Sequence, residues 1–373
     1  MRPSSVLLLA RELGIGGSER QLCEMALALD RSRYQVHVGC FRSGGIRALE
    51  VRAAGMPVVE FPLRSLRSPK NVLETILALR RYIQRHDIRL VHPFDVSANL
   101  FVAVAAYALG PTVIMTSQRS FRRRLPPTLR AGLRLADRLS DGVVVNCRAV
   151  GEHLVSDERV PRARIHLCHN GLDAVRFHRA AAIPADLPQT GPVIGTLCSM
   201  RPEKNLPALL QAFAVCRARN PRLRLTLVGD GPDRAGVLQQ AAALGIASSC
   251  TFQPTVSDVV PWLSAIDIFV LPSVSEALSN ALMEAMACGC ACVASRVGGN
   301  AELIEHDVTG RLFASADVAA LVEQIEQLAA DPGLRRRLGQ RAAATIREQF
   351  SVHAAAERLG LIYDEALAAK SCR

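Results

Sequence analysis

Two acidic side chains, Glu276 and Glu284, are the residues whose type and spacing most directly suggest chemistry. Glu276 follows an apolar run, Ile266 to Leu271, which is predicted to be a buried strand that leads into a loop. Glu284 lies in the first turns of a helix that is predicted to begin near Asn280. With seven residues between them, the two carboxylates are expected at two points along one groove rather than on one helix face.

The elements around these acids predict a ligand site. A second strand, Ala291 to Ala294, closes a β-loop-α-β unit, and its loop should open at the carboxyl edge of a sheet, where open α/β folds bind ligands. Backbone amides at the helix start are expected to donate to a phosphate, and they belong to Leu278, Ser279, Asn280 and Ala281. A carboxylate is repelled by phosphate, so each Glu should instead accept hydrogen bonds from the hydroxyls of a ribose or a hexose. A nucleotide-sugar site is therefore predicted; the alternative is that both acids are surface charges on an amphipathic helix.

Two cations, Arg201 and Lys204, follow the predicted strand Val193 to Leu197 and precede the predicted helix Leu206 to Ala218. Fixed cations at a sheet edge stabilise the charge that develops on a diphosphate leaving group. The alternative is a pair of surface cations, which the dipole at a helix start disfavours.

The pattern S-x-x-E-A-x-x-N-x-x-x-E-A-M-A-C-G, followed by V-G-G-N-A-E at Val297 to Glu302, closely resembles the donor-binding signature of the GT-B glycosyltransferases of family 4. In that family the first Glu contacts the donor sugar and the second the ribose, which implies these roles for Glu276 and Glu284. Weaker similarity runs from Gly14 to about Phe350. The resemblance implies a retaining transfer of a hexose from a nucleoside diphosphate sugar to an acceptor hydroxyl, in a cleft between two Rossmann-like domains.

Two positions depart from the family pattern. The family usually has an Arg where this chain has Ser199, so either Arg201 substitutes at the phosphate or the phosphate contact is weaker. Many relatives place a His after the strand that corresponds to Val113 to Ser117. Here Gln118 and Arg119 follow, so that contact with the donor sugar must change or come from another residue.

Further site candidates lie in the first half of the chain. Gly16 and Gly17 open a helix that Ser18 is expected to cap, and the resemblance implies that this loop faces the donor diphosphate. His92 and Arg119 end predicted strands and are acceptor-side candidates. For His92 the alternative is a buried side chain bonded by the backbone.

Strand and helix patterns alternate along all 373 residues, which predicts an α/β fold of two doubly wound domains. The Ala- and Pro-rich segment 180–192 is the linker candidate. We expect an acceptor-side domain at 1–182 and a donor domain at 183–373, with the boundary near Ala182. By resemblance, the last helix, Val352 to Ala368, crosses back to the first domain.

No metal and no cofactor are expected. The 11 cysteines are scattered, and Cys288, Cys290 and Cys292 run from a helix end into a strand without the paired spacing of zinc sites. The uncharged stretch Val96 to Gln118 approaches membrane-spanning length, but a Gly-Pro pair divides it into a predicted helix and a strand. A reduced, cytoplasmic protein is the expectation.

The net charge of +11 predicts an anionic partner. Nucleic acid is not expected, because aromatic interleaving, a zinc finger and a helix-turn-helix pattern are missing. A basic segment instead favours a peripheral membrane surface, where an acceptor on a lipid phosphate would belong to a bacterial-type cell-surface glycan such as lipopolysaccharide. Its cations are Arg119, Arg122, Arg123, Arg124, Arg130, Arg134 and Arg138, and its apolar residues are Phe121, Leu125, Leu129 and Leu133, which could equally be core.

Two other functions fit the same residues. A nucleotide-sugar epimerase can share this architecture but uses no acceptor. A non-catalytic protein that binds sugar nucleotides is favoured only by Ser199 and the absent His.

Overall fold

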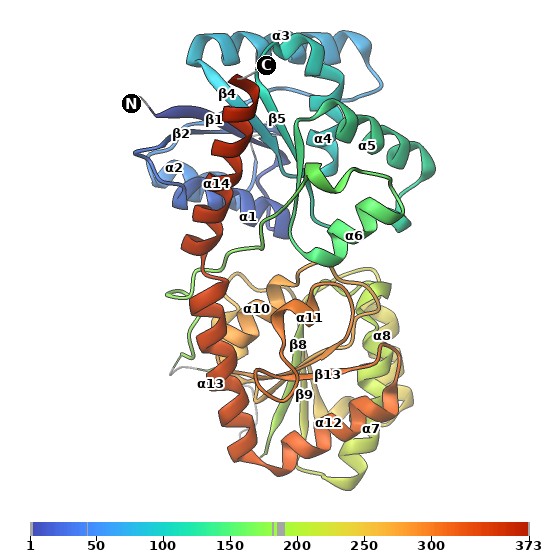
Figure 1. The fold of residues 1–373 in the computed structure, drawn as a ribbon. Coiled ribbons are helices and arrows are strands. Elements are labelled where there is room, and N and C mark those ends of the chain that lie inside the picture. Colours follow the sequence, from blue (N-terminus) through green and yellow to red (C-terminus); the bar gives the residue numbers. More distant parts are fainter. Residues whose placement is uncertain (1–2, 43, 181–182, 185–190, 372–373) are drawn as a thin grey trace. The chain divides into compact units, whose positions relative to one another are not determined.

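The computed structural model describes residues 3–42, 44–180, 183–184 and 191–371, and the chain divides into two units (Figure 1). The first unit runs to Gly171 and resumes at Val352, and the second comprises Leu172–Ser351. The predicted boundary at Ala182 lies outside the described residues.

The first unit is built on a parallel sheet with the strand order β3-β2-β1-β4-β5-β6-β7. The strands are β1 (Ser4–Glu12), β2 (Tyr34–Arg42), β3 (Val58–Glu60), β4 (Ile88–Pro93), β5 (Val113–Gln118), β6 (Gly142–Val145) and β7 (Ile165–Leu167). The strand order reverses between β1 and β4, which is the point where such sheets bind ligands at their carboxyl ends.

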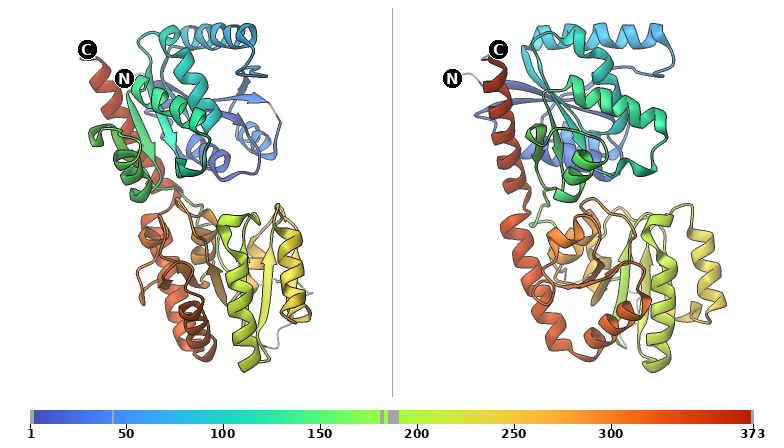
Figure 2. Two further views of the ribbon diagram at one scale, coloured as in Figure 1. Left: turned by 90° about the vertical axis from the view of Figure 1, so that its right-hand side faces the viewer. Right: turned by 45° about the vertical axis from the view of Figure 1, so that its right-hand side comes forward.

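Helices cover both faces of this sheet (Figure 2). They are α1 (Gly17–Ala28), α2 (Ile46–Ala53), α3 (Pro69–His86), α4 (Val96–Ala105), α5 (Pro127–Leu139), α6 (Arg148–Ser156) and α14 (Val352–Ser371), with the short 3-10 turns η1 (Ala106–Leu109), η2 (Arg122–Arg124) and η3 (Arg162–Arg164). Side chains alternate across β1: Val6 and Leu8 join the core formed with α1 and α14, while Leu7 and Leu9 join the core formed with α3 and α4.

The last helix, α14, contributes core residues to the first unit. Leu359, Ile362 and Tyr363 are buried in the same cluster as the residues of β1 and α1. The Tyr34 hydroxyl donates to the backbone carbonyl of Gly360 over 2.7 Å and ties β2 to this helix.

The second unit repeats the architecture with the order β10-β9-β8-β11-β12-β13, again parallel throughout. Its strands are β8 (Val193–Leu197), β9 (Arg224–Val228), β10 (Cys250–Gln253), β11 (Ile268–Leu271), β12 (Ala291–Ser295) and β13 (Arg311–Phe313). Its helices are α7 (Leu206–Arg219), α8 (Arg234–Ala243), α9 (Val260–Ala265), α10 (Asn280–Ala287), α11 (Asn300–Leu303), α12 (Val318–Ala330) and α13 (Pro332–Gln349), with η4 (Pro202–Lys204) and η5 (Ala247–Ser249). Two doubly wound α/β units confirm the predicted fold class.

The long uncharged stretch Val96 to Gln118 forms α4, η1 and β5, which confirms its division into a helix and a strand. Over the described part of the chain, no helix combines the length and the apolar character that crossing a bilayer requires. None of the cysteines described forms a disulfide.

Candidate functional site

Lys204 and Glu276 form an ion pair at the carboxyl edge of the second sheet. Lys204 ends η4, after β8, and Glu276 lies in the loop after β11. The Lys204 ammonium donates to Glu276 Oε1 over 2.5 Å, and both side chains are mostly buried, at 18% and 10% exposure. The two loops are also joined through the backbone, because the Val274 amide donates to the Glu203 carbonyl over 2.9 Å. The structure therefore brings together two side chains that lie 72 positions apart in the sequence.

Two serines hold the Glu276 carboxylate and its loop in place. The Ser273 hydroxyl donates to Glu276 Oε1 over 2.7 Å, and the Ser295 hydroxyl at the end of β12 donates to the Ser273 carbonyl over 2.5 Å. Both serines are wholly buried, so these bonds are shielded from water. Sequence reasoning missed this support, although Ser273 is the first residue of the quoted signature.

A glycine turn lies against the Glu276 loop. Gly298 has φ +50°, and a Cβ there would approach the Glu276 carbonyl oxygen to 1.7 Å. The next amide, of Gly299, donates to the Ala277 carbonyl over 2.7 Å. The V-G-G segment of the signature thus fixes the main chain that carries Glu276.

The loop that carries the two cations rests on the β9 turn. The Met200 amide donates to the Asp230 carbonyl over 2.9 Å. A Cβ on Gly231 would lie 2.3 Å from the Met200 carbonyl, so only glycine allows this approach. Arg201 and Ser199 are exposed, in contrast to the half-buried Lys204.

The helix α10 begins as predicted, at Asn280. The Ser279 hydroxyl accepts from the Leu282 amide over 3.3 Å and caps the helix, which leaves Leu278 and Ser279 buried at its start. Glu284 lies within α10 and is 7% exposed. Glu276 lies in the loop before α10 and Glu284 within that helix, so the expectation that they act at separate points of the donor stays a prediction.

The helix α1 starts at Gly17, with Gly16 in the N-cap position and without a side-chain cap. The prediction that Ser18 caps this helix was therefore wrong. The Glu19 carboxylate instead folds back over Gly16, where a Cβ would lie 2.2 Å from Glu19 Oε2. Burial raises the pKa of Glu19, partly offset by a bond to its own backbone amide. A carboxylate thus occupies the helix end at which a phosphate was expected.

His92 is wholly buried in β4, which contradicts its assignment to the acceptor side. Nδ1 lies 2.6 Å from the Tyr363 hydroxyl, and Nε2 lies 2.7 Å from the Ser117 hydroxyl. Both ring nitrogens bond to side chains. The alternative, a buried histidine bonded by the backbone, was therefore right about burial and wrong about the bonding partners. Burial, with the nearby Arg119 charge, places the pKa of His92 well below its usual value. His92 is a neutral core residue that joins β4, β5 and α14.

Arg119 lies just beyond β5 and is half-buried. Nη1 donates to the Asn170 side chain over 2.8 Å, and the guanidinium lies 4.6 Å from the centre of the Phe94 ring. Burial lowers the pKa of Arg119 to about 10. This cation is part of the edge of the first sheet and does not belong to a solvated basic loop.

The predicted membrane-facing segment is only partly exposed. Arg122 is 1% exposed and makes a bidentate pair with Asp137, with N–O distances of 2.6 and 3.0 Å. Leu133 is fully buried. These two residues are core because α5 packs on α4 and β5, and Arg122 is also bonded to Gln118 at the end of β5. Arg130 and Arg134 share the buried carboxylate of Glu158, whereas the exposed residues of α5 include Leu129, Leu135, Arg138 and Leu139.

The described residues contain no cluster of three His, Cys, Asp or Glu side chains arranged to hold a metal ion. The three clustered cysteines are engaged elsewhere: Cys290 Sγ donates to the Leu263 carbonyl and Cys292 Sγ to the Cys290 carbonyl. Burial raises the pKa of Cys288 to about 12, so it is a thiol rather than a thiolate ligand at neutral pH.

Each half of the chain matches a known protein family. Residues 15–176 match the family described as Glycosyltransferase Family 4, and residues 182–345 match the family described as Glycosyl transferases group 1.

Curated relatives are similar over part of their length. N-acetyl-alpha-D-glucosaminyl L-malate synthase of Bacillus anthracis is 34% identical over 171 residues, 46% of this chain and 45% of that protein. The lipopolysaccharide core biosynthesis glycosyltransferase LpsE of Rhizobium meliloti is 30% identical over 214 residues, 57% of this chain and 61% of that protein. The chain thus spans about half to three fifths of these relatives.

Among solved structures, Anabaena Alr3699/HepE in complex with UDP and glucose has a TM-score of 0.84 and 21% identity, over 97% of this chain and 100% of that chain. At this identity the likeness concerns the fold, and it confirms the two-domain fold that the sequence predicted.

Proposed function

The chain belongs to the group 1 glycosyltransferases of family 4, with the GT-B fold, and from this we propose that it transfers a hexose from a nucleoside diphosphate sugar to an acceptor hydroxyl. The observation that carries the proposal is the ion pair between Lys204 and Glu276 at the carboxyl edge of the second sheet. It holds a cation and a carboxylate side by side, as a donor with a charged diphosphate and a hydroxylated sugar requires.

Different residues are proposed to bind the diphosphate, the sugar and the ribose of the donor. Lys204 and the exposed Arg201 hold the diphosphate and stabilise the charge that develops on it as the glycosidic bond breaks. The amides at the start of α10, from Leu278 to Ala281, bind phosphate at the positive helix end. Glu276 accepts from the sugar hydroxyls and Glu284 from the ribose. Transfer proceeds with retention at the anomeric carbon, as in the family.

The leaving group needs no metal in this proposal, because the side-chain cations and helix amides neutralise it. In support, the carboxylate of Glu276 beside the proposed diphosphate contact already accepts from Lys204 and Ser273. The complex of HepE with UDP and glucose favours a uridine diphosphate donor.

We assign the acceptor to a lipid-linked precursor of a cell-surface glycan. LpsE, a relative in lipopolysaccharide core biosynthesis, supports this class. So do the exposed side chains of α5, which include the apolar Leu135 and Leu139 beside Arg138 and are suited to a peripheral contact with an anionic membrane. A soluble acceptor is the competing possibility, as the malate synthase relative suggests.

Donor and acceptor are tested separately. Thermal unfolding in the presence of UDP, GDP and ADP sugars should show stabilisation by one nucleotide class, and product analysis should show the sugar joined to an acceptor. Release of an epimerised free sugar would instead assign an epimerase, and binding without turnover would assign a non-catalytic protein. For the acceptor, the protein should float with phosphatidylglycerol vesicles and be released by salt; indifference to lipid charge would favour a soluble acceptor.

A further inference from the structure

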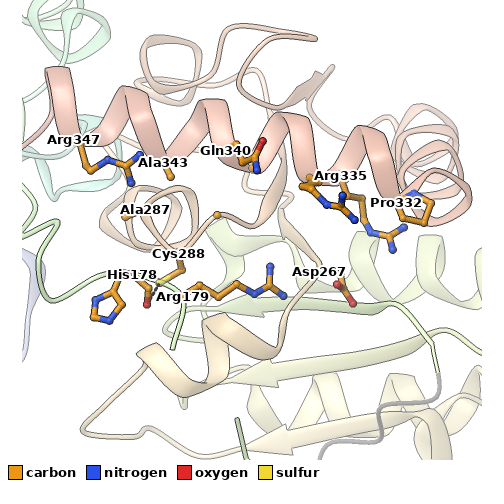
Figure 3. A pocket seen from close by; sticks show the side chains of 13 residues that line it. His178, Arg179, Asp267, Ala287, Cys288, Pro332, Arg335, Gln340, Ala343 and Arg347 are labelled. Carbon is orange, nitrogen blue, oxygen red and sulfur yellow. Dashed lines mark hydrogen bonds between the residues drawn. The ribbon is translucent and has the colours of Figure 1, made fainter. Parts of the chain in front are cut away.

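A cavity of about 510 Å³ lies in the second unit, away from the donor loops (Figure 3). One wall is the helix α13, the other is formed by the C-terminal end of α10 and the segment that carries His178 and Arg179. Asp267, which lines the cavity, immediately precedes β11, whereas Glu276 follows β11. Because the strands are parallel, the cavity is at the amino edge of the sheet, opposite to the edge that carries the Lys204–Glu276 pair.

The lining is strongly cationic. It includes four arginines, Arg179, Arg335, Arg336 and Arg347, against the single carboxylate of Asp267. One oxygen of Asp267 already accepts from the Val193 amide over 2.9 Å. The C-terminal carbonyls of α10 add only a partial negative charge, and the first turn of α13 adds a partial positive one. The cavity therefore carries a net positive charge.

Asp267 is the one carboxylate in the described lining, and it forms no ion pair with these four arginines. Arg335 is held by α12, since Nη1 donates to the carbonyls of Leu328 and Ala329 over 2.6 and 3.1 Å. Arg179, Arg336 and Arg347 have no ion pair within the part of the chain that the structure describes. Elsewhere in this unit the exposed Arg219 is paired, with Glu326 at 2.8 Å. Most of the positive charge of the cavity is therefore not compensated by protein groups and is open to an anion from solution.

The cations come from opposite walls. In Figure 3, Arg179 extends along the floor toward Asp267, and Arg335 projects from α13 above it. Guanidinium groups present planar pairs of donors that match phosphate oxygens. The volume lies within the range of about 300–1,000 Å³ typical of sites for small molecules, and it exceeds what a single phosphate needs.

We propose that this arginine cavity binds a phosphate-bearing small molecule, at a site separate from the donor site. The proposal does not depend on the transferase function, because none of the cavity residues belongs to the donor loops. The phosphate is carried either by a soluble metabolite or by a lipid headgroup.

The test uses inorganic pyrophosphate and isothermal titration calorimetry in a Lys204→Ala background, which disables the proposed diphosphate contact of the donor site. Removing Arg179 and Arg336 together, as Arg179→Ala with Arg336→Ala, should lower pyrophosphate affinity at least tenfold, since each loses charged hydrogen bonds. Both side chains are exposed, so the fold should tolerate the change. The matched control is Arg337→Ala with Arg341→Ala, which removes two exposed charges of α13 outside the cavity.

If pyrophosphate affinity falls equally in the control pair, the effect comes from the overall charge of the protein, and the proposed site is overturned. Pyrophosphate binding that survives loss of Arg179 and Arg336 would also overturn it. Loss of pyrophosphate binding already with Lys204→Ala overturns the site when phosphatidic acid vesicles also fail to bind. A second arm identifies the source: flotation with phosphatidic acid vesicles that depends on Arg179 and Arg336, without binding of pyrophosphate, assigns the phosphate to a lipid headgroup. Failure of both probes to distinguish the cavity variant from the control rejects the proposal.

Discussion

Lys204 and Glu276 are bonded to each other, so a bound donor must either replace this ion pair or share its two groups. The pair is 2.5 Å apart and mostly buried, so it fixes the geometry of both groups before the donor arrives. Arrival of a diphosphate gives Lys204 a second anion, and the sugar hydroxyls give Glu276 a second set of donors. The residues proposed for sugar and phosphate are therefore energetically coupled.

The two glutamates should differ in their effect on nucleotide binding. Glu284→Ala should weaken UDP binding about tenfold or more, because the ribose loses a charged acceptor. Glu276→Ala should leave UDP affinity unchanged or tighter, because Lys204 loses its competing carboxylate, while transfer falls about 10²-fold or more. Calorimetry with UDP and initial-rate assays measure the two quantities. Equal losses of UDP affinity in the two variants would contradict the division of roles.

Arg201 provides the test of the departure at Ser199. If Arg201 supplies the missing family cation, Arg201→Ala should reduce turnover about 10²-fold with little change in thermal stability, since its side chain is exposed. Arg337→Ala, which removes another exposed charge of the same unit, is the control and should leave turnover unchanged. A rate for Arg201→Ala equal to that of the control would mean that Lys204 acts without this cation.

At the scale of elements, the turn at Gly298 supports the Glu276 loop. Gly298→Ala places a Cβ 1.7 Å from the Glu276 carbonyl oxygen at a φ of +50°, a backbone conformation that costs a non-glycine residue about 1–2 kcal/mol. The loop must move, so both the midpoint of thermal unfolding and the transfer rate should fall. Gly236→Ala is the control: Gly236 lies in α8 with open space around its Cα, and alanine there should stabilise the helix by about 0.5–1 kcal/mol. A Gly298→Ala enzyme with full transfer activity would show that the turn does not position Glu276.

The sequence predicted helices and strands better than the contacts between side chains that lie far apart in the chain. The strand before Glu276, the helix start at Asn280 and the division of the Val96–Gln118 stretch follow from apolar runs and breakers, which are local signals. The pairing of Lys204 with Glu276 and the burial of His92 depend on how distant loops and helices meet, and no local pattern encodes that. For the same reason the local pattern predicts a surface cation at Arg122, although its bidentate pair with Asp137 makes it part of the core.

At the scale of the whole molecule, stability should depend on pH through His92. Because burial depresses its pKa, the folded protein keeps the ring neutral while the unfolded chain takes up a proton below about pH 6.5. Stability should therefore fall as pH drops from 7.5 to 5.5, by up to about 1.4 kcal/mol per pH unit for one histidine. Burial also lowers the pKa of His37 and His166, so the wild-type slope has several contributors.

His92→Asn should be less stable than the wild type and should show a shallower dependence of its urea midpoint on pH, followed by circular dichroism. The exposed His353 lies on α14 of the same unit, so His353→Asn is the control and should keep the wild-type slope. An unchanged slope in His92→Asn would show that this ring does not stay neutral in the folded protein.

The position of α14 in the first unit has a consequence for biosynthesis. The core around β1 needs Leu359, Ile362 and Tyr363, which leave the ribosome only after all of Leu172–Ser351 has been made. The second unit is continuous in the chain and can close its sheet as soon as its own residues emerge. Vectorial synthesis usually favours the N-terminal domain, but here the nascent first unit keeps an open face on β1 and α1 until α14, which is translated after the second unit, covers it.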